Sequence, residues 1–361
     1  MKELRLMKGN EAIAEAAIRC GTDGYFGYPI TPQSEILEYL MAQNPYETTG
    51  MMVLQAESEV ASINMLYGAA GCGKKTMTSS SSPGISLMTE GISYLAGAEI
   101  PCLIVNVVRS GPGLGTIQPA QGDYFQAVKG GGHGDYRTIV LAPASVQEMC
   151  DFVKLGFDLA FKYRIPLMIL SDGVIGQMME KVELFEPIAR WTDEELVQNA
   201  PWATTGKPKN RERNTISSLH LEASNQEIHV RKLEKKYQEI EQNEVRFEKI
   251  QCDDAEYLFV AYGASARICQ KAIQIARAKG IKVGLLRPIT LFPFPKQALY
   301  EMTSQVKAML CVEMSLGQMI EDVQLATKFK VPVEHYGRVG GITPTPDEIV
   351  HILEQKFMGG K

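Results

Sequence analysis

Residues 76–123 read TMTSSSSPGISLMTEGISYLAGAEIPCLIVNVVRSGPGLGTIQPAQGD, and the fold prediction starts from this stretch. Ser82, Pro83 and Gly84 predict a turn, because proline fixes φ and glycine permits close approach of the backbone. Apolar residues then recur at helical spacing over 85–95. The pattern predicts a helix that follows the turn, and the first amide groups of this helix could face a ligand.

The next segment, 102–108, reads CLIVNVV. Such a nearly continuous apolar and β-branched run is typical of a parallel strand that is covered on both faces. The strand should end at Arg109, where the glycine-rich loop 110–115 begins. In open parallel sheets ligands bind beyond the carboxyl ends of the strands, so Arg109 is a candidate for ligand recognition. A solvated or ion-paired arginine at a strand end is the alternative.

Strand-like and helix-like patterns alternate through the rest of the chain, which predicts an α/β fold. Further strands are expected at 24–29, 52–55, 137–143, 166–173, 257–263, 283–288, 308–313 and 331–336. Helices are expected at 11–20 and 56–70. A third helix should begin with a capping box made by Ser145 and Glu148 and run to about 161. The predicted organisation is a parallel-sheet domain over 1–185, a linker with a charged helical excursion over 186–252, and a second α/β domain over 253–361.

The linker region has its own composition. A polar run at 206–211 precedes a charged helical stretch near 219–247. We expect this excursion to pack on a partner or across the domains, and a solvated helix is the equally plausible alternative.

Composition excludes several classes of protein. The chain has 361 residues and a formal net charge of −5, without a basic stripe that would indicate nucleic-acid binding. No run of eighteen apolar residues predicts a membrane span. The seven cysteines are scattered and form no CxxC spacing, so we expect reduced core residues in a cytosolic protein, and neither an iron–sulfur cluster nor another metal site on this chain.

Two more segments contain candidate site residues. In YPITPQSE (28–35), Thr31 has the position of a helix N-cap and Pro32 that of the first helical residue. In QAESEVAS (55–62), a helix is expected to begin with two carboxylates, Glu57 and Glu59. A carboxylate in the first turn is favourable through the helix dipole alone, so its position does not by itself indicate function.

These two segments, together with SPGISLMTEG (82–91) and VVRSGPG (107–113), resemble the α subunit of the 2-oxoacid:ferredoxin oxidoreductases, which are thiamine-diphosphate enzymes. LLRPITLFPFP (285–295) and CVEMSLGQM (311–319) resemble the second domain of that subunit. The segment 115–136 is most similar to the branched-chain (3-methyl-2-oxobutanoate) branch, with the 2-oxoglutarate branch next. The resemblance implies a pyrimidine-type thiamine-diphosphate-binding domain followed by an α/β domain like the C-terminal domain of transketolase.

The resemblance also implies roles for single residues. Glu59, in preference to Glu57, matches the glutamate that hydrogen-bonds N1′ of the cofactor's aminopyrimidine and so favours the imino tautomer that deprotonates the thiazolium ring. Residues 82–84 match the cofactor-binding turn. Arg109 matches the arginine that binds the 2-oxoacid carboxylate, for which a planar guanidinium is suited, and Thr31 matches the threonine that contacts the substrate carboxylate or the cofactor.

The implied reaction is oxidative decarboxylation of a branched-chain 2-oxoacid with coenzyme A, giving an acyl-CoA and CO₂ and reducing ferredoxin. The family's Mg²⁺-diphosphate motif is missing: Ser171-Asp172-Gly173 is the nearest string, and no paired asparagines follow it. The Mg²⁺ and diphosphate are therefore expected on a β subunit and the iron–sulfur clusters on a ferredoxin-like subunit.

Two alternatives stay open at this point. Activity on 2-oxoglutarate would need a second cation, for which Lys129, His133 and Arg137 are candidates. A non-catalytic scaffold subunit of the same fold is the alternative from another class.

Overall fold

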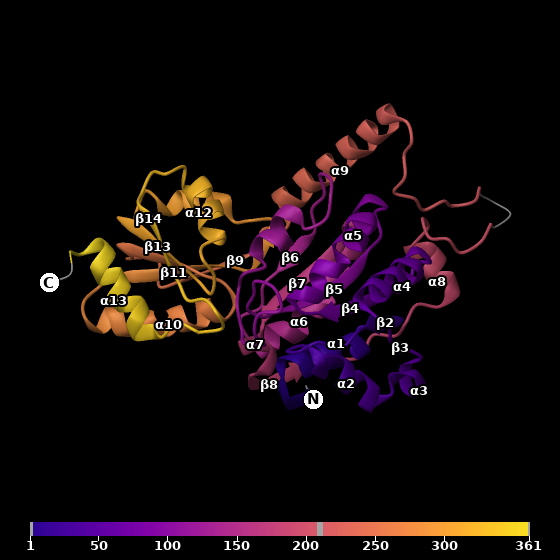
Figure 1. Cartoon of the computed structure of the whole chain (residues 1–361), viewed down its shortest axis with the longest axis horizontal. Coiled ribbons are helices and arrows are strands. Elements are labelled where there is room, and N and C mark those ends of the chain that lie inside the picture. Colours follow the sequence, from indigo (N-terminus) through magenta and orange to yellow (C-terminus); the bar gives the residue numbers. More distant parts are fainter. Residues whose placement is uncertain (1–2, 208–211, 360–361) are drawn as a thin grey trace.

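A seven-stranded sheet forms the first half of the computed structural model, which describes residues 3–207 and 212–359 (Figure 1). The strand order is β12-β6-β7-β5-β4-β2-β3. All neighbours pair in parallel except β12, which is antiparallel to β6. The strands are β2 (Gly24–Gly27), β3 (Met52–Gln55), β4 (Thr76–Ser80), β5 (Cys102–Val108), β6 (Ile139–Leu141), β7 (Pro166–Asp172) and β12 (Thr290–Phe292). Strand β5 is buried along its whole length, as its apolar run predicted.

Helices cover both faces of this sheet. Helix α4 packs against α5, and α1 packs against α2 and α6. Right-handed crossovers between the parallel strands place these two groups on opposite faces. The helices of the first half are α1 (Gly9–Arg19), α2 (Ser34–Gln43), α3 (Pro45–Thr49), α4 (Glu59–Gly71), α5 (Ser82–Gly97), α6 (Val146–Tyr163) and α7 (Gly173–Gln177), with a π-helix η1 (Gln126–Gly130).

A five-stranded sheet forms the second domain, in the order β14-β13-β10-β11-β9. Its elements are β9 (Phe247–Ile250), β10 (Tyr257–Val260), α10 (Gly263–Ala278), β11 (Val283–Pro288), α11 (Lys296–Met302), β13 (Ala308–Glu313), α12 (Met319–Thr327), β14 (Val333–Gly337) and α13 (Pro346–Phe357). The edge strand β9 lies in the stretch predicted as linker, and β12 leaves this domain to pair with β6 of the first sheet. The two domains are thus joined through backbone pairing as well as side chains.

The capping box predicted for α6 is only half formed. The Ser145 hydroxyl accepts a hydrogen bond from the Glu148 amide at 3.1 Å. The Glu148 carboxylate, however, accepts from the Ala144 amide instead of the Ser145 amide, and it forms a bidentate ion pair with Arg287 of the second domain. The Glu148 side chain, which would complete the capping box, therefore forms the contact between the two domains instead.

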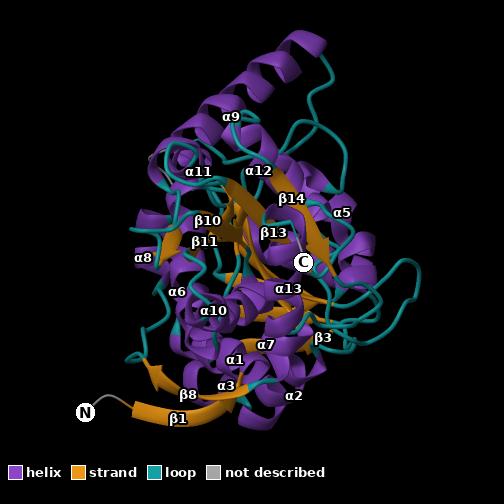
Figure 2. Ribbon diagram, turned by 90° about the vertical axis from the view of Figure 1, so that its left-hand side faces the viewer, coloured by secondary structure: helices purple, strands orange, loops and turns teal. Residues whose placement is uncertain are grey.

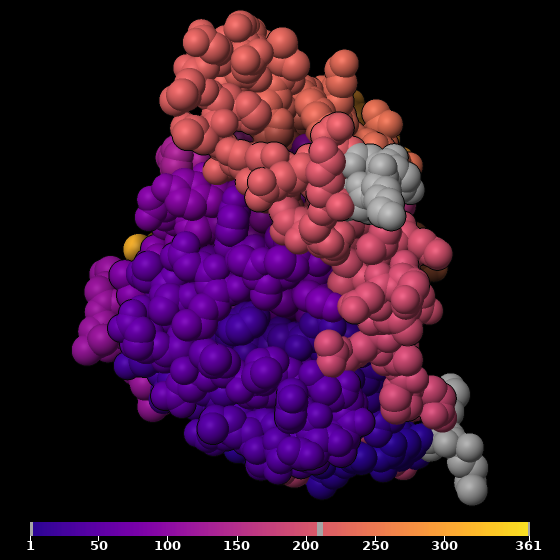
Figure 3. Space-filling view, turned by 90° about the vertical axis from the view of Figure 1, so that its right-hand side faces the viewer, coloured from indigo at the N-terminus to yellow at the C-terminus, as the bar shows by residue number. Residues whose placement is uncertain are grey.

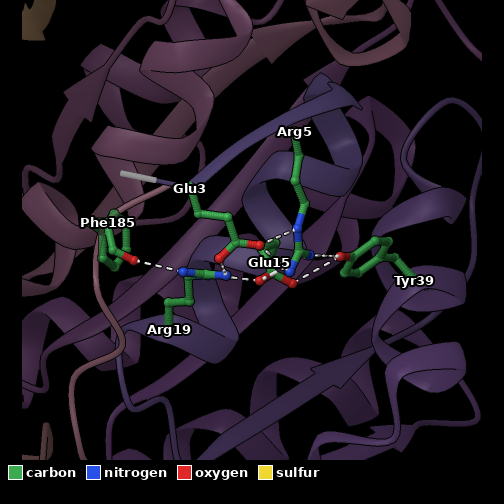
Figure 4. Close-up of polar contacts among 6 residues, drawn as sticks. All are labelled: Glu3, Arg5, Glu15, Arg19, Tyr39 and Phe185. Atoms are coloured by element: carbon green, nitrogen blue, oxygen red, sulfur yellow. Dashed lines mark hydrogen bonds and ion pairs between the residues drawn. The ribbon is translucent and has the colours of Figure 1, made fainter. Parts of the chain in front are cut away.

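A two-stranded antiparallel ribbon at the margin of the first domain was not predicted from sequence (Figure 2). It pairs β1 (Glu3–Lys8) with β8 (Met179–Leu184). A polar cluster fastens the ribbon to the helices beneath it (Figure 4). Glu15, which is buried, accepts hydrogen bonds from Arg19 at 2.7 Å and from Tyr39 at 2.8 Å. Arg19 also pairs with Glu3 of the ribbon, so the buried charges are mutually satisfied.

The excursion between the domains lies along the first domain (Figure 3). It contains α8 (Asp193–Asn199) and the charged helix α9 (Ala223–Asn243), close to the predicted position. Lys236 of α9 is ion-paired to buried Glu99 at 2.5 Å, so α9 packs on the first domain as well as facing solvent. Of the polar run predicted at 206–211, residues 208–211 lie outside the described residues.

Most of the cysteines lie in the core, as the sequence predicted. Six of the seven cysteines are buried and all are unpaired, while Cys72 is exposed. In the described part of the chain, every helix is too short or too polar to cross a lipid bilayer.

Candidate functional site

The predicted site residues lie where several parallel strands end. Thr31 follows β2, Glu59 follows β3, the turn 82–84 follows β4, and Arg109 follows β5. Carboxyl ends of parallel strands meet at one edge of a sheet, which is where ligands bind in such folds. The first turn of α5 touches two of these residues, since Gly84 lies against Glu59 and Ser82 is bonded to Arg109.

Glu59 is a buried residue whose carboxylate has no partner in the part of the chain that the structure describes. It is the first residue of α4, after Ser58, whose hydroxyl caps the helix by accepting from the Ala61 amide at 3.2 Å. Its side chain is only 6% exposed, and no hydrogen bond or ion pair reaches its carboxylate from the described residues. An unpartnered buried carboxylate is costly, so its presence indicates a ligand or a partner that completes it.

The competing carboxylate, Glu57, has a different environment. It is exposed and accepts a hydrogen bond from the Ser58 hydroxyl at 2.9 Å. Of the two, only Glu59 is both buried and unpartnered.

Gly84 is the residue that lets Glu59 lie against α5. A Cβ at this position would come within 2.6 Å of the Glu59 Oε1 and 2.0 Å of the Ser80 hydroxyl. The hydroxyls of Ser80 and Ser81 are also buried without hydrogen-bond partners. A carboxylate with two free hydroxyls near one helix start suits a flat heterocycle with ring nitrogens and an amino group, so these residues fit an aminopyrimidine.

The amides at the start of α5 have protein partners, contrary to the expectation that they could face a ligand. The Ser82 amide donates to the Asn106 side chain at 3.1 Å, and the Gly84 amide donates to the Ser81 carbonyl at 2.7 Å. Pro83 has no amide hydrogen. Residues 82–84 therefore contribute shape and spacing, and not free donors, to this edge of the sheet.

Arg109 is held in place with part of its donor capacity unused. Its guanidinium donates to the carbonyls of Thr31 and Leu114, both at 3.1 Å. The residue is 7% exposed, and its Nε is buried without a partner. A buried arginine with two nitrogens anchored and Nε free is suited to an incoming carboxylate.

Thr31 is not a helix cap, so this part of the prediction is wrong. Helix α2 begins at Ser34 with Gln33 at the cap position. The loop is held instead by distant residues. The Asn10 Nδ2 donates to the Pro32 carbonyl at 2.7 Å, and the Gln177 Nε2 donates to the same carbonyl at 3.1 Å. Thr31 is exposed, and among the described residues its hydroxyl has no partner, so it is available next to Arg109.

Sequence reasoning missed two residues that border the site, Asn106 and Asp123. Asn106 is the single polar residue in the apolar run 102–108, and that isolation is the signal that could have identified it. Burial raises the pKa of Asp123 above the usual aspartate range, against an opposing hydrogen bond from Asn106. Both residues lie beside the first turn of α5.

Asp172, the nearest match to a metal motif, has a structural environment. Its carboxylate accepts from the amides of Val174 and Ile175, and from the Ala264 amide at the start of α10. Burial raises its pKa despite these bonds. In residues 3–207 and 212–359 no cluster of three acidic, histidine or cysteine side chains is arranged to hold a metal ion.

The candidates for a second substrate carboxylate lie elsewhere. Lys129 is ion-paired with Asp322 at 2.5 Å, and Arg137 donates to the Lys129 carbonyl. These two line a hollow of about 580 Å³ beside α9, and His133 lines a neighbouring one of about 120 Å³. Neither hollow is lined by Thr31 or Arg109.

Comparison with known proteins agrees with this geometry. Residues 15–243 match the family described as "Pyruvate flavodoxin/ferredoxin oxidoreductase, thiamine diP-bdg", and residues 255–349 match "Pyruvate:ferredoxin oxidoreductase core domain II". The ketoisovalerate oxidoreductase subunit VorB of Methanothermobacter thermautotrophicus is 51% identical over 342 residues, with 93% of each chain covered.

Two solved structures share the fold. The 2-oxoglutarate:ferredoxin oxidoreductase from Magnetococcus marinus, with 2-oxoglutarate, coenzyme A and succinyl-CoA bound, is similar with a TM-score of 0.83 and 28% identity. The alignment covers 98% of this chain and 65% of that chain. A split-gene transketolase has a TM-score of 0.60 at 13% identity, with 98% of this chain and 99% of that chain covered, which indicates a common fold alone.

Fold and site together define a thiamine-diphosphate-binding α/β protein. The chain belongs to the pyruvate flavodoxin/ferredoxin oxidoreductase family and is a subunit of an oxidoreductase. The predicted family is confirmed, as is a thiamine-diphosphate-binding domain followed by a second, transketolase-like α/β domain.

Proposed function

We propose that this chain is the α subunit of a thiamine-diphosphate-dependent 2-oxoacid:ferredoxin oxidoreductase that acts on the branched-chain acid 3-methyl-2-oxobutanoate. The observation that carries the proposal is a pair of groups on either side of the α5 start that have no partner among the described residues: the carboxylate of Glu59, a residue only 6% exposed, and the buried Arg109 Nε. A scaffold subunit would gain nothing from leaving these groups unsatisfied, because each costs folding free energy.

Each residue has a definable task in this reaction. Thiamine diphosphate, when bound, supplies a nucleophilic carbon for the keto group and an electron sink for decarboxylation. Glu59 can share a proton with a ring nitrogen through its free carboxylate, in an environment from which water is largely removed. Arg109 can bind the 2-oxoacid carboxylate through Nε and its remaining N–H groups, and the Thr31 hydroxyl can donate to the same carboxylate.

The substrate class is supported by two observations. Identity is 51% with a ketoisovalerate oxidoreductase subunit, against 36% with the 2-oxoglutarate synthase subunit KorA of Methanocaldococcus jannaschii. Two of the three cations that could bind a second carboxylate also have protein partners, Lys129 with Asp322 and Arg137 with the Lys129 carbonyl. A branched apolar side chain needs no such cation.

A β subunit is proposed to cover the outer face of α4 and α5. Val60 is 47% exposed and Leu87 is 56% exposed on these neighbouring helices. Gly68 has no atom within 4 Å of a Cβ built on it, which leaves room for close helix packing. Exposed apolar side chains next to an unsatisfied site are typical of an interface. Cross-linking of the complex that finds no β-subunit contact near 61–70 would contradict this placement.

The remaining parts of the reaction are assigned to partner chains. We place Mg²⁺ and the diphosphate on the β subunit, and the iron–sulfur clusters that pass electrons to ferredoxin on a ferredoxin-like subunit. Seven unpaired thiols suit a reducing compartment, so the proposed location is the cytosol.

The test is turnover of the chain purified with its native partners. Viologen reduction is followed with coenzyme A and thiamine diphosphate, using 3-methyl-2-oxobutanoate, pyruvate and 2-oxoglutarate in parallel. The proposal expects the highest kcat/KM with the branched acid. A preference for 2-oxoglutarate would contradict the substrate and keep the reaction class, whereas no reduction by a complete complex would contradict both.

A further inference from the structure

We propose that Asp123 is a positioning residue for 2-oxoacid binding, because its side chain holds Asn106 and, through Asn106 and Ser82, fixes the backbone of Arg109. The inference rests on the proposed function, in which Arg109 binds the substrate carboxylate. It adds to that function a residue that does not touch the substrate. This residue fixes the backbone position from which the Arg109 side chain extends.

A chain of hydrogen bonds runs from Asp123 to Arg109. The Asn106 Nδ2 donates to the Asp123 Oδ2 at 2.9 Å, and the Asn106 Oδ1 accepts from the Ser82 amide at 3.1 Å. The Ser82 hydroxyl accepts from the Arg109 amide at 3.1 Å and donates to the Arg109 carbonyl at 3.1 Å. The Asn106 side chain therefore connects the carboxylate with the residue that clamps the backbone of Arg109.

Asp123 determines which way the Asn106 amide points. Asn106 is 1% exposed, so no solvent is available to replace a lost partner. With a carboxylate on one side, the Nδ2 must face Asp123 and the Oδ1 must face Ser82, since a carboxylate only accepts. The reversed amide would direct two donors at each other and break the bond to Ser82.

The second domain fixes the segment that contains Asp123. On the N-terminal side of Asp123, the contact is made by Gln121. Gln121 is 2% exposed, and its Oε1 accepts from the Met314 amide at 3.0 Å and from the Ser265 hydroxyl at 2.7 Å. Its Nε2 donates to the Tyr262 carbonyl at 2.9 Å. All three partners belong to the second domain.

A second glutamine holds the other side of the segment. The Gln318 Oε1 accepts from the Phe125 amide at 2.8 Å, and its Nε2 donates to the Gly122 carbonyl at 2.7 Å. Asp123 is thus held on both sides by contacts with the second domain. This gives the second-domain motif CVEMSLGQM, which includes Met314 and Gln318, a role at the first-domain site that it does not itself line.

The experiment compares Asp123→Ala, Asp123→Asn and the matched control Asp254→Ala in the native complex. Asp254 is an aspartate of the second domain that is paired with Arg277. KM and kcat are measured with 3-methyl-2-oxobutanoate, and the Kd for thiamine diphosphate is measured by calorimetry. Amide hydrogen exchange over 82–90 supplies a readout that is independent of turnover.

For Asp123→Ala we expect KM to rise about tenfold, with kcat within about threefold and the Kd for thiamine diphosphate rising by no more than about threefold, because Glu59 is untouched and only the α5 start beside it is loosened. Asp123→Asn should restore KM to within about threefold of the wild type, since its amide oxygen can accept from Asn106. Exchange over 82–90 should be faster in Asp123→Ala than in Asp254→Ala, because the Ser82 contact is loosened.

Three results would overturn the proposal: an unchanged KM in Asp123→Ala, an equal rise in Asp123→Ala and Asp123→Asn, or a loss confined to kcat. If Asp123→Ala fails to assemble, Gln318→Ala loosens the same segment from the second domain and should raise KM about threefold. An unchanged KM there would also count against it. If the wild-type complex reduces no acceptor with any 2-oxoacid, the proposed function fails, and hydrogen exchange over 82–90 still decides whether Asp123 orders the α5 start.

Discussion

Two buried glutamates, one in each domain, have opposite environments. Glu59 is the first residue of α4 and has no protein partner among the described residues. Glu313 ends β13 with no exposed surface, and its carboxylate accepts from the amides of Gln318, Met319 and Ile320 and from the Ser315 hydroxyl. Both carboxylates lie at a helix start, where the helix dipole favours negative charge.

The difference separates a structural carboxylate from a functional one. The fully bonded Glu313 closes the N-terminus of α12 and has little capacity left for a ligand. Glu59 leaves the same capacity unused at the edge where the first sheet's strands end. Position and burial are alike in the two cases, so the unmet hydrogen-bonding capacity is the property that indicates function.

The largest predicted effect is that of Glu59→Gln. An amide cannot share a proton as a carboxyl group does, so turnover of the complex should fall about a thousandfold, while the complex still assembles and is at least as stable to heat, because an unpaired charge is removed. The measurement is viologen reduction with 3-methyl-2-oxobutanoate. Glu57→Gln is the control and should stay within about twofold, because Glu57 is exposed. Full activity in Glu59→Gln would favour a scaffold subunit.

Glu313→Ala should act on stability instead. It leaves three backbone amides buried without an acceptor, so the free energy of unfolding should fall by about 3–4 kcal/mol. Urea unfolding of the full chain measures it. The matched control, Glu334→Ala, removes a surface pair with Lys356 and should change the free energy by less than about 0.5 kcal/mol. Equal losses in the two variants would remove the contrast with Glu59.

Arg109→Lys tests the other unmet group. A lysine keeps the charge but lacks the planar fork that can bond two carbonyls and a carboxylate together, so KM for the 2-oxoacid should rise about twentyfold. Steady-state kinetics of the complex measure this rise. Arg277→Lys, at an ion pair in the second domain, serves as the control and should leave KM unchanged. A KM that stays constant in Arg109→Lys would mean that the free Nε has another purpose.

The sequence predicted the parts of this contrast that depend on local pattern. Strand β5, the helix that contains Glu59 and strands β10, β11, β13 and β14 of the second domain follow from apolar periodicity and capping signals, which act over a few residues. Arg109 was identifiable because a charge ends an apolar run.

The parts that were missed depend on contacts between distant residues. The ribbon of β1 and β8 pairs segments more than 170 residues apart, and neither strand has a strong pattern of its own. Thr31 looked like a cap because Thr-Pro is a common helix start, but Asn10 and Gln177 hold the Pro32 carbonyl outside the helix. The bond between Asn106 and Asp123 likewise exists only once the sheet has formed.

A third buried carboxylate, Glu99, lies between the two extremes and gives the smallest effect. Burial alone would raise the pKa of Glu99, but hydrogen bonds from Lys232 and Lys236 of α9 outweigh it and hold the pKa at about 2. A lowered folded-state pKa stabilises the protein fully above the unfolded value of about 4.5 and is lost as pH falls through about 2. Glu99→Gln should therefore lower the free energy of unfolding by about 1–2 kcal/mol at pH 7, a modest value because Lys232 is largely exposed.

The difference between wild type and Glu99→Gln should shrink to less than half by about pH 3, because the carboxyl group is then mostly protonated in the unfolded chain and folding must release that proton. Urea unfolding at pH 7 and pH 3 measures both values. Glu227→Gln, on an exposed turn of the same helix, is the control and should show no such pH dependence. A difference that persists undiminished at pH 3 would mean that packing, and not charge, holds α9 on the first domain. Glu99 would then be a structural carboxylate, as Glu313 is.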